Sequence, residues 1–149
     1  MQGSSIQFAV FLFLAMFNAG AMTTLQIQHY GIYPYVERDD FKRYMQANNR
    51  AALVPAVLPG LALFVFSLSL VFSRPPFITF LEAAGCFLLN LVALISTFIW
   101  QRKLQEEMAA TGYDDAKIKR LLLTNWIRTC AFLIQAVLVT ALAVQSCGS

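Results

Sequence analysis

Several polar side chains lie inside or at the ends of long apolar stretches, where their chemistry would be kept away from water. Asn125 and Arg128 lie near the start of the last stretch, and Asn49 and Gln101 lie at the ends of two others. Polar groups are costly in lipid and usually face the interior of a helical bundle. Because a buried cation needs a partner, we expect Arg128 to be buried and bonded to at least two oxygen groups, with Asn125 and Asn49 or Gln101 nearby.

His29 is the single histidine of the chain and follows the first apolar stretch. Tyr30, Tyr33 and Trp100 are predicted to lie at the same level of the protein. Histidine is the side chain that exchanges a proton most readily near neutral pH. A structural explanation of the whole set stays open, because Tyr and Trp form interfacial belts and buried Asn and Gln often only join helices.

Glu82 is a lone carboxylate in the third apolar stretch. Such a group can bind a proton or a cation, as in small four-helix multidrug exporters, although those carry the acid in their first span. The simpler interpretation is a protonated glutamate, or one that extends to the membrane surface beside Arg74.

Several common kinds of chemistry leave no trace in this sequence. It has no Gly-rich phosphate loop, no nucleophile elbow and no pair of histidines at metal-ligand spacing. We therefore expect no metal and no cofactor. Three cysteines without C-x-x-C spacing predict neither a redox pair nor a zinc site. The basic connections also contain seven acidic residues, so we expect no nucleic-acid partner.

The composition indicates the elements that must position these residues. The chain has 149 residues, of which 58% are hydrophobic and 13% charged, whereas soluble domains carry about 25% charge. Its apolar residues form four blocks, approximately 6–28, 51–72, 77–100 and 121–144. Each is long enough to cross a bilayer as a helix, the form that satisfies backbone polar groups in lipid. We predict one all-α transmembrane domain over residues 1–149, a four-helix bundle in contact with the lipid bilayer.

The distribution of basic residues predicts the orientation. Nine Lys and Arg residues lie in the two long connections: Arg38, Lys42, Arg43 and Arg50 in the first, and Arg102, Lys103, Lys117, Lys119 and Arg120 in the second. The short connection on the other side carries Arg74 alone. Cytoplasmic loops are enriched in such residues, so we predict an inner (plasma) membrane protein with both termini outside. The first block lacks a basic n-region and is interpreted as a retained span, not a signal peptide.

The two long connections contain helix start and stop signals. Asp39 or Asp40 can cap a helix that runs into the second span, so that spans two, three and four extend into the cytoplasm. Gly112 is expected to end the extension of span three, and Asp114 to cap the helix of span four. Pro55 and Pro59 should kink span two. We expect this kink to leave room for a cytoplasm-facing pocket beside His29.

Longer motifs carry a resemblance to known proteins. The stretch from Gly112 to Thr129, which ends in Thr124-Asn125-Trp126-Ile127-Arg128-Thr129, and the preceding stretch from Ser96 to Gln101 resemble small bacterial four-span membrane proteins. More distantly, Asn49-Arg50 and Asn125…Arg128-Thr129 are similar to motifs of the membrane family of unknown function that includes anthrone oxygenases. The chain departs from the group at Asn48-Asn49 and Arg102-Lys103, where members often carry histidines.

The resemblance implies an oxygenase that needs no cofactor. Such an enzyme removes an acidic C–H proton from a polycyclic phenolic substrate, and the carbanion then reacts with dioxygen. By this resemblance His29 would be the base. Donors to the developing oxyanion would be Arg128, Asn125, Asn49 and Gln101, and the aromatic walls would be Tyr30, Tyr33 and Trp100.

Three functions from different classes are therefore open. The first is a pocket for a hydrophobic small molecule, with oxygenase chemistry as its most specific form. The second is a non-enzymatic binding or assembly subunit, whose polar stripes join helices or the copies of a homo-oligomer. The third is a small transporter that uses Glu82. An inner cavity beside Arg128 and His29 would favour the first, and a filled bundle the second.

Overall fold

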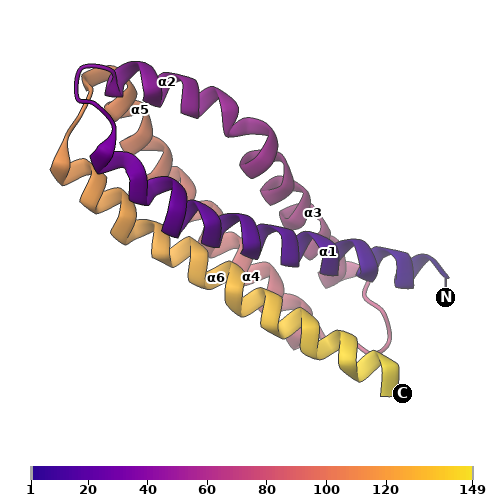
Figure 1. The fold of residues 1–149 in the computed structure, drawn as a ribbon. Coiled ribbons are helices and arrows are strands. Elements are labelled where there is room, and N and C mark those ends of the chain that lie inside the picture. The colour runs from indigo at the N-terminus through magenta and orange to yellow at the C-terminus, as the bar shows by residue number, and fades with distance from the viewer. Residues whose placement is uncertain (1, 149) are drawn as a thin grey trace.

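The computed structural model describes the backbone of residues 2–148 and the side chains of residues 6–52 and 54–146. Within this range the chain is helical and contains no strand. Its α-helices are α1 (Gln2–Thr24), α2 (Phe41–Ala51), α3 (Leu58–Phe72), α4 (Phe80–Ser96), α5 (Arg102–Thr111) and α6 (Asp115–Gly148). They form an elongated bundle of four arms, in which α1 and α6 stand alone, α2 continues into α3, and α4 continues into α5 (Figure 1).

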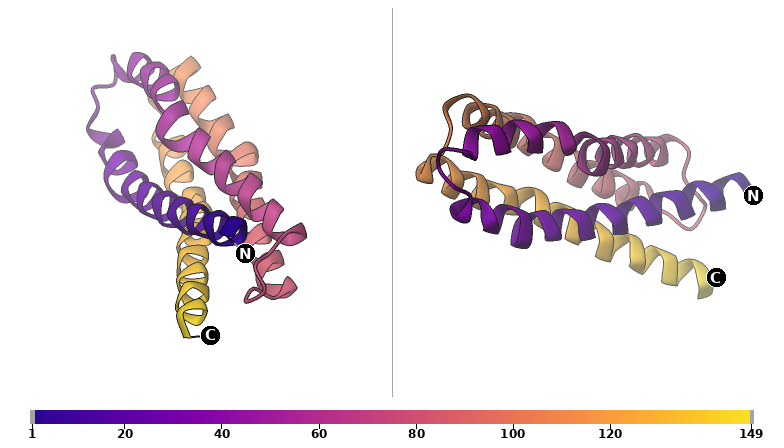
Figure 2. Two further views of the ribbon diagram at one scale, coloured as in Figure 1. Left: turned by 90° about the vertical axis from the view of Figure 1, so that its right-hand side faces the viewer. Right: turned by 45° about the horizontal axis from the view of Figure 1, so that its top comes forward.

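The four arms run alternately up and down. α1 begins and α6 ends at the end of the bundle that also holds the α3–α4 connection, and the two longer connections lie at the opposite end (Figure 1). α6 packs against both α1 and α4, α3 packs against α4, and α2 packs against α5. The second and third arms lie side by side in both views of Figure 2. The prediction of an all-α four-helix bundle is confirmed.

Each arm contains a helical stretch long and apolar enough to cross a membrane: Ile6–Tyr35, Val54–Phe72, Phe80–Thr111 and Asp115–Ser146. Three of the four are longer than the apolar blocks predicted from the sequence, because helical structure continues past the apolar residues. Large apolar side chains are displayed on the outside of the bundle, such as Phe72 and Leu81 at 81% exposure and Val137 at 72%. Surfaces of this kind suit contact with lipid and identify a multi-pass membrane protein.

The helix start and stop signals predicted for the two long connections are confirmed except at Asp40, and the position of Glu82 also needs a correction. α5 ends at Gly112, whose φ of 92° favours glycine, and Asp114 Oδ1 accepts from the N–H groups of Ala116 and Lys117 at 2.9 and 3.1 Å. Asp40 occupies the N-cap position of α2, but its side chain makes no cap bond. Glu82 is not well inside its span: it lies in the first turn of α4 and forms a reciprocal capping box with Thr79.

Three of the four arms are interrupted by one π-helical turn: Leu25–His29 after α1, Leu53–Val57 between α2 and α3, and Thr97–Gln101 between α4 and α5. In the second arm the carbonyl of Ala52 accepts from both Ala56 and Val57, at 3.1 and 3.3 Å. Pro55 and Pro59 explain this turn, because neither can donate to the preceding helical carbonyls. The other two turns contain no proline or glycine.

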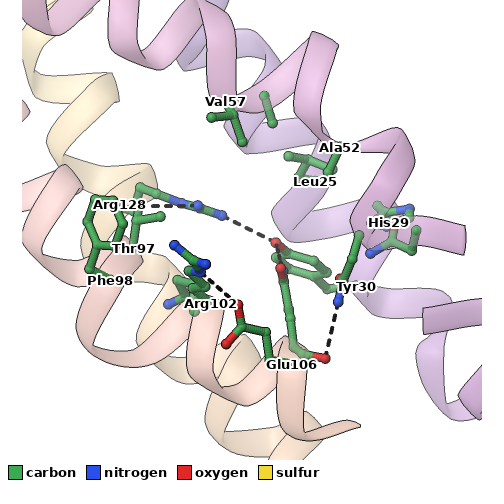
Figure 3. Close-up of a pocket in the computed structure, with 15 residues that line it drawn as sticks. Leu25, His29, Tyr30, Ala52, Val57, Thr97, Phe98, Arg102, Glu106 and Arg128 are labelled. Atoms are coloured by element: carbon green, nitrogen blue, oxygen red, sulfur yellow. Dashed lines mark hydrogen bonds and ion pairs between the residues drawn. The ribbon is translucent and has the colours of Figure 1, made fainter. Parts of the chain in front are cut away.

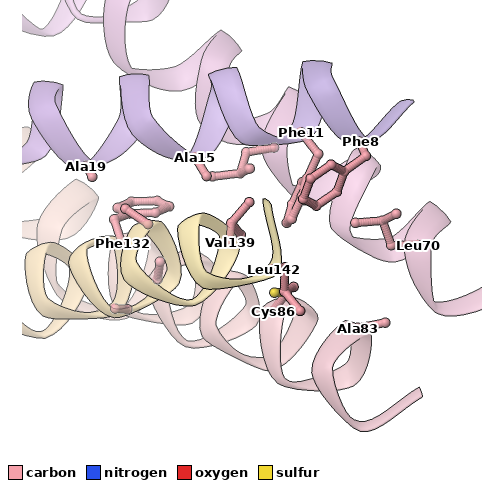
Figure 4. Close-up of a cluster of buried hydrophobic side chains, with 14 of the residues drawn as sticks. Phe8, Phe11, Ala15, Ala19, Leu70, Ala83, Cys86, Phe132, Val139 and Leu142 are labelled. Atoms are coloured by element: carbon pink, nitrogen blue, oxygen red, sulfur yellow. The ribbon is translucent and has the colours of Figure 1, made fainter. Parts of the chain in front are cut away.

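The interior has two hydrophobic clusters with a polar layer between them. In the first cluster Phe11 and Ala15 of α1 face Val139 and Leu142 of α6 (Figure 4). The second cluster lies at the end with the long connections and contains the side chains Tyr30, Tyr33, Phe41, Met45, Leu104, Met108, Ile118 and Leu121. Along the first, third and fourth arms, buried polar residues fall between the two clusters, namely Gln26, Gln101, Asn125 and Arg128. Such a layer is the place where polar chemistry can occur within an otherwise apolar bundle.

Replacing Asp114 with alanine should lower the free energy of unfolding by about 1 kcal/mol, because two N–H groups of α6 lose their acceptor. Thermal unfolding in detergent, followed by circular dichroism, measures the change. Asp40→Ala is the matched control, since Asp40 stands at an N-cap without making a cap bond. Equal losses in the two variants would contradict the assignment of the Asp114 cap.

Candidate ligand-binding site

A cavity of about 450 Å³ lies within the polar layer, a size typical of small-molecule sites. All four arms contribute to its wall, with His29 from the first, Ala52 from the second, Thr97 from the third and Arg128 from the fourth (Figure 3). Each of the three π turns supplies lining residues. Single π turns in helices occur frequently at functional sites, and here three of them surround one cavity.

Arg128 is buried, with 9% of its surface exposed, and three oxygen atoms hold its guanidinium group. Nη2 donates to Asn125 Oδ1 at 2.6 Å and to Tyr30 Oη at 3.2 Å, and Nη1 donates to Thr97 Oγ1 at 3.4 Å. Figure 3 shows the side chain extended toward Tyr30. These partners come from three different arms, so the cation joins the arms around the cavity.

Asn125 orients this network from behind Arg128. It is fully buried, and its Nδ2 donates to Gln26 Oε1 at 2.6 Å, which leaves Oδ1 to face the guanidinium group. Gln26 is fixed in turn, because its Nε2 donates to the carbonyl of Leu122 at 3.1 Å. The chain Leu122–Gln26–Asn125–Arg128 therefore holds every amide in one orientation.

All three partners of Arg128 are neutral. Glu106 lines the same cavity, but its Oε1 lies 2.7 Å from Arg102 Nε, and it pairs with that residue. Among the described residues, no ion pair involves Arg128. The cavity therefore contains a buried positive charge that no carboxylate neutralises, and a low-dielectric environment strengthens its attraction for an anion.

His29 lies on the other side of Tyr30 from Arg128 (Figure 3). Asn48 donates from Nδ2 to Tyr33 Oη at 3.1 Å, so its Oδ1 is left to accept from His29 Nε2 at 2.8 Å. This arrangement assigns the proton of the neutral imidazole to Nε2. The lone pair of His29 is then carried by Nδ1, which makes no hydrogen bond among the described residues.

The aromatic residues around His29 keep this region neutral. Its ring centroid lies 5.6 Å from that of Tyr30, 5.4 Å from that of Tyr33 and 6.5 Å from that of Tyr44. Burial raises the pKa of the Tyr44 phenol above its ordinary value. No carboxylate lies within salt-bridge distance of His29 in the described part of the chain.

Three residues of the cavity wall hold buried polar atoms that have no protein partner. These atoms are Arg128 Nε, Gln101 Oε1 and Asn49 Oδ1. Gln101 donates from Nε2 to Thr124 at 3.0 Å, and Asn49 donates from Nδ2 to the carbonyl of Gln105 at 3.3 Å, so only their acceptors are unused. Unsatisfied buried groups are costly. Three of the six such atoms in the described residues lie on this cavity wall, and the others are Ser96 Oγ and the two polar atoms of the Gln135 side chain.

The structure brings most of the residues singled out from the sequence to this cavity. His29, Tyr30, Asn49, Gln101 and Arg128 line it. Tyr33 and Asn125 lie directly behind the lining, bonded to Asn48 and to Arg128 respectively. Arg128 has the buried position and the oxygen partners that we expected from its sequence position.

Among the three predicted aromatic walls, Tyr30 lines the cavity and Tyr33 lies behind it. Trp100 is not part of the lining. It packs against the second hydrophobic cluster, and Phe98 lines the cavity in its place. The π turn Thr97–Gln101 explains the difference, because it changes the angle between successive side chains from that of an α-helix. In the second arm the carbonyl of Pro59 accepts from Asn18 Nδ2 at 3.2 Å, and neither Arg128 nor Asn125 donates to that arm among the described residues.

Two residues of the hydrogen-bond network around the cavity were not recognised as site residues from the sequence. Gln26 orients Asn125, and Gln105 donates from Nε2 to Tyr30 Oη at 3.0 Å. Gln26 precedes His29 by three positions, a helical spacing that could have identified it. Gln105 gave no signal, because it lies in the charged extension of the third arm.

The donor set of the cavity is suited to an organic ligand. Among the described residues, no group of three or more His, Cys, Asp or Glu side chains could hold a metal ion. The unpaired guanidinium N–H of Arg128 suits an oxygen anion on an organic molecule, and the free amide oxygens of Gln101 and Asn49 suit a hydroxyl or N–H donor. Comparisons of the chain with protein-family models, curated proteins and solved structures find no match.

Replacing Asn125 and Arg128 with leucine, singly and together, should reveal strong coupling. Either single change leaves a buried polar group without its partner, whereas the double change removes both groups. The summed losses in unfolding free energy should exceed the loss in the double variant by about 1–3 kcal/mol. Denaturation in mixed micelles measures each value.

Thr140→Val, combined with Arg128→Leu, provides the control cycle. Thr140 bonds only to the carbonyl of Ala136 on its own helix, at 2.7 Å, so its effect should add to that of Arg128→Leu within about 0.5 kcal/mol. Additivity in the Asn125 cycle as well would show that the 2.6 Å contact does not stabilise the protein.

Proposed function

We propose that the cavity binds a flat, hydrophobic small molecule that carries an ionisable oxygen. One observation carries this proposal: the buried guanidinium group of Arg128 lines an open cavity and has only neutral partners. An anion held there would form the charge-assisted hydrogen bonds that the protein itself does not supply. The apolar part of the wall, which includes Leu25, Ala56 and Phe98, would contact the body of the molecule.

The reaction that fits this donor set is a cofactor-independent oxygenation of an anthrone-type substrate. His29 Nδ1 takes a proton from the methylene carbon, and Arg128 stabilises the resulting phenolate-like anion. The carbanion reacts with dioxygen and, after protonation, yields a hydroperoxide, which loses water to leave a ketone. One O₂ accepts four electrons from the methylene carbon and ends as one carbonyl oxygen and one water molecule, so atoms and electrons balance.

Tyr30 would have the central role in positioning the substrate. Its hydroxyl group joins Arg128 and Gln105, at 3.2 and 3.0 Å, and its ring packs beside His29. A planar substrate lying along this ring would have its oxygen near the cation and its acidic carbon toward the imidazole. Gln101 and Asn49 would supply additional polar contacts, as their unused acceptors suggest.

The two other functions are less well supported. A subunit whose polar stripes serve only to join helices would have a filled interior, and the cavity argues against that. Glu82 has a structural role, because its Oε2 accepts from both the N–H and the hydroxyl group of Thr79 at 2.8 Å. It is therefore a poor candidate for the cation site of a transporter.

The activity test uses the full chain reconstituted in vesicles, with an anthrone as substrate. We expect oxygen uptake and quinone formation at rates above those of empty vesicles. His29→Gln should lower the catalysed rate about 10²- to 10⁴-fold, and Arg128→Gln about 10²- to 10³-fold, as the loss of a general base and of an oxyanion donor do.

Arg120→Gln is the matched control, because Arg120 is exposed and does not line the cavity. It should retain the activity of the parent protein. A rate no higher than that of empty vesicles, or full activity in His29→Gln, would refute the oxygenase reaction.

We also propose that the protein lies in the plasma membrane with both termini outside, so that the cavity occupies the cytoplasmic half of the bundle. The distribution of basic residues supports this orientation. A membrane-impermeant maleimide added to intact cells should label Cys147, whose side chain lies outside the described residues. In Cys147→Ser with Asp39→Cys, labelling should require permeabilised cells, and the reverse pattern would overturn the orientation.

A further inference from the structure

The second and third arms separate at the level of the cavity. α2 packs against α5 and α3 packs against α4, but no Cα atom of the turn Leu53–Val57 lies within 8 Å of a Cα atom of Thr97–Gln101. Figure 1 shows the outward bow of the α2–α3 arm. Ala56 on one side and Phe98 on the other both line the cavity, and we call the space between these two turns the window.

The local sequence explains why the window stays open. The prolines of the second arm prevent regular helix formation, and the carbonyl of Ala52 is shared by two N–H groups. Two of the side chains that line the cavity from this arm are small, namely Ala52 and Ala56. On the opposite side, the π turn Thr97–Gln101 bends the third arm at the same level.

The two edges of the window have different character. Val57 and Phe98, at 43% and 56% exposure, form an apolar edge that suits contact with lipid. Arg102 and Glu106 form a charged edge toward the long connections, and their side chains are 63% and 59% exposed. A charged edge beside an apolar edge is typical of the interface between hydrocarbon and headgroups.

The cations at the outer and inner ends of the window differ in whether a carboxylate neutralises them. Arg102 is neutralised by Glu106 at the charged edge, whereas Arg128 inside has only neutral partners. In Figure 3 the Arg128 side chain lies between Val57 and Phe98 in the view. A molecule in the window would therefore meet lipid-like walls first and an unneutralised cation at the end.

We propose that the ligand is a lipid-soluble acid that passes from the bilayer through this window and places its anion on Arg128. When bound, its apolar body lies between Ala56 and Phe98, and its acidic oxygen accepts hydrogen bonds from the guanidinium group. This inference rests on the proposed function, to which it adds the ligand class and the source of the ligand. The second hydrophobic cluster fills the interior of the bundle toward the long connections, which leaves the window as the proposed route.

A fluorescence experiment tests this proposal. The reporter protein carries Phe98→Trp together with Trp100→Phe and Trp126→Phe, which puts the only indole at the window. It is reconstituted in phosphatidylcholine vesicles and titrated with dibrominated stearic acid or with its methyl ester, since bromine quenches indole on contact. The acid should quench at an approximately tenfold lower mole fraction than the ester, the effect of one charge-assisted hydrogen bond.

Two further changes in the reporter protein separate the cation from the window. Arg128→Gln should make the acid and the ester quench alike. Ala56→Phe fills the window and should raise the mole fraction of acid needed to that of the ester. Ala52→Phe repeats this test where Ala56→Phe does not retain the parent helix content, and Leu61→Phe, an exposed position on the same arm, should have no effect.

The outcomes distinguish this inference from the proposed function. Acid and ester quenching alike in the reporter protein would overturn this inference, whereas the oxygen-uptake test with an anthrone decides the proposed function separately. A preference for the acid that needs Arg128 but persists in Ala56→Phe and Ala52→Phe would retain the anion site and overturn the route from the bilayer. Loss of the preference in the window-filling variants and in Arg128→Gln supports both.

Discussion

A single buried guanidinium group determines how the interior of this bundle is arranged. Transferring an unpaired cation into a low-dielectric environment is costly, so Arg128 must be surrounded by hydrogen-bond acceptors. Asn125, Tyr30 and Thr97 supply them from three arms, and Gln26 fixes the orientation of Asn125. The arms thus have to meet at one level, and the hydrophobic core is divided into a cluster on either side of that level.

The three π turns lie at this same level, and their position has a physical consequence. In a membrane a helix must satisfy its own backbone groups, so irregular backbone is tolerated mainly where it lines a cavity or is buried in protein. Here the turns Leu25–His29, Leu53–Val57 and Thr97–Gln101 all contribute to one cavity wall. They widen the bundle locally while the arms remain tightly packed on both sides, which makes a cavity compatible with a stable fold.

The sequence predicts the architecture well and the site in part, for reasons that individual residues make clear. Spans follow from long apolar blocks, and Gly112 and Asp114 mark helix ends through local chemistry. The direction in which each side chain faces can be predicted from the sequence only where the helix is regular. A π turn that contains no proline or glycine changes the periodicity without leaving a signal in the sequence. Trp100 therefore packs against the second cluster and not on the cavity wall, while Gln105 contacts Tyr30 from a charged segment in which no sequence pattern indicated it.

The charge of the groups that bond to Arg128 affects what the cavity can bind as well as the stability of the fold. A carboxylate in the place of Asn125 would neutralise the cation and compete with any anion in the cavity. Amide, phenol and hydroxyl partners satisfy its N–H groups and leave its charge available. Tyr30 contacts both Arg128 and His29. His29 donates from Nε2 to Asn48, and its Nδ1 makes no hydrogen bond among the described residues. An imidazole beside the ring of Tyr30 and a cation at its hydroxyl group thus lie near each other. The carbanion formation that we propose needs both a proton acceptor and a stabiliser of negative charge.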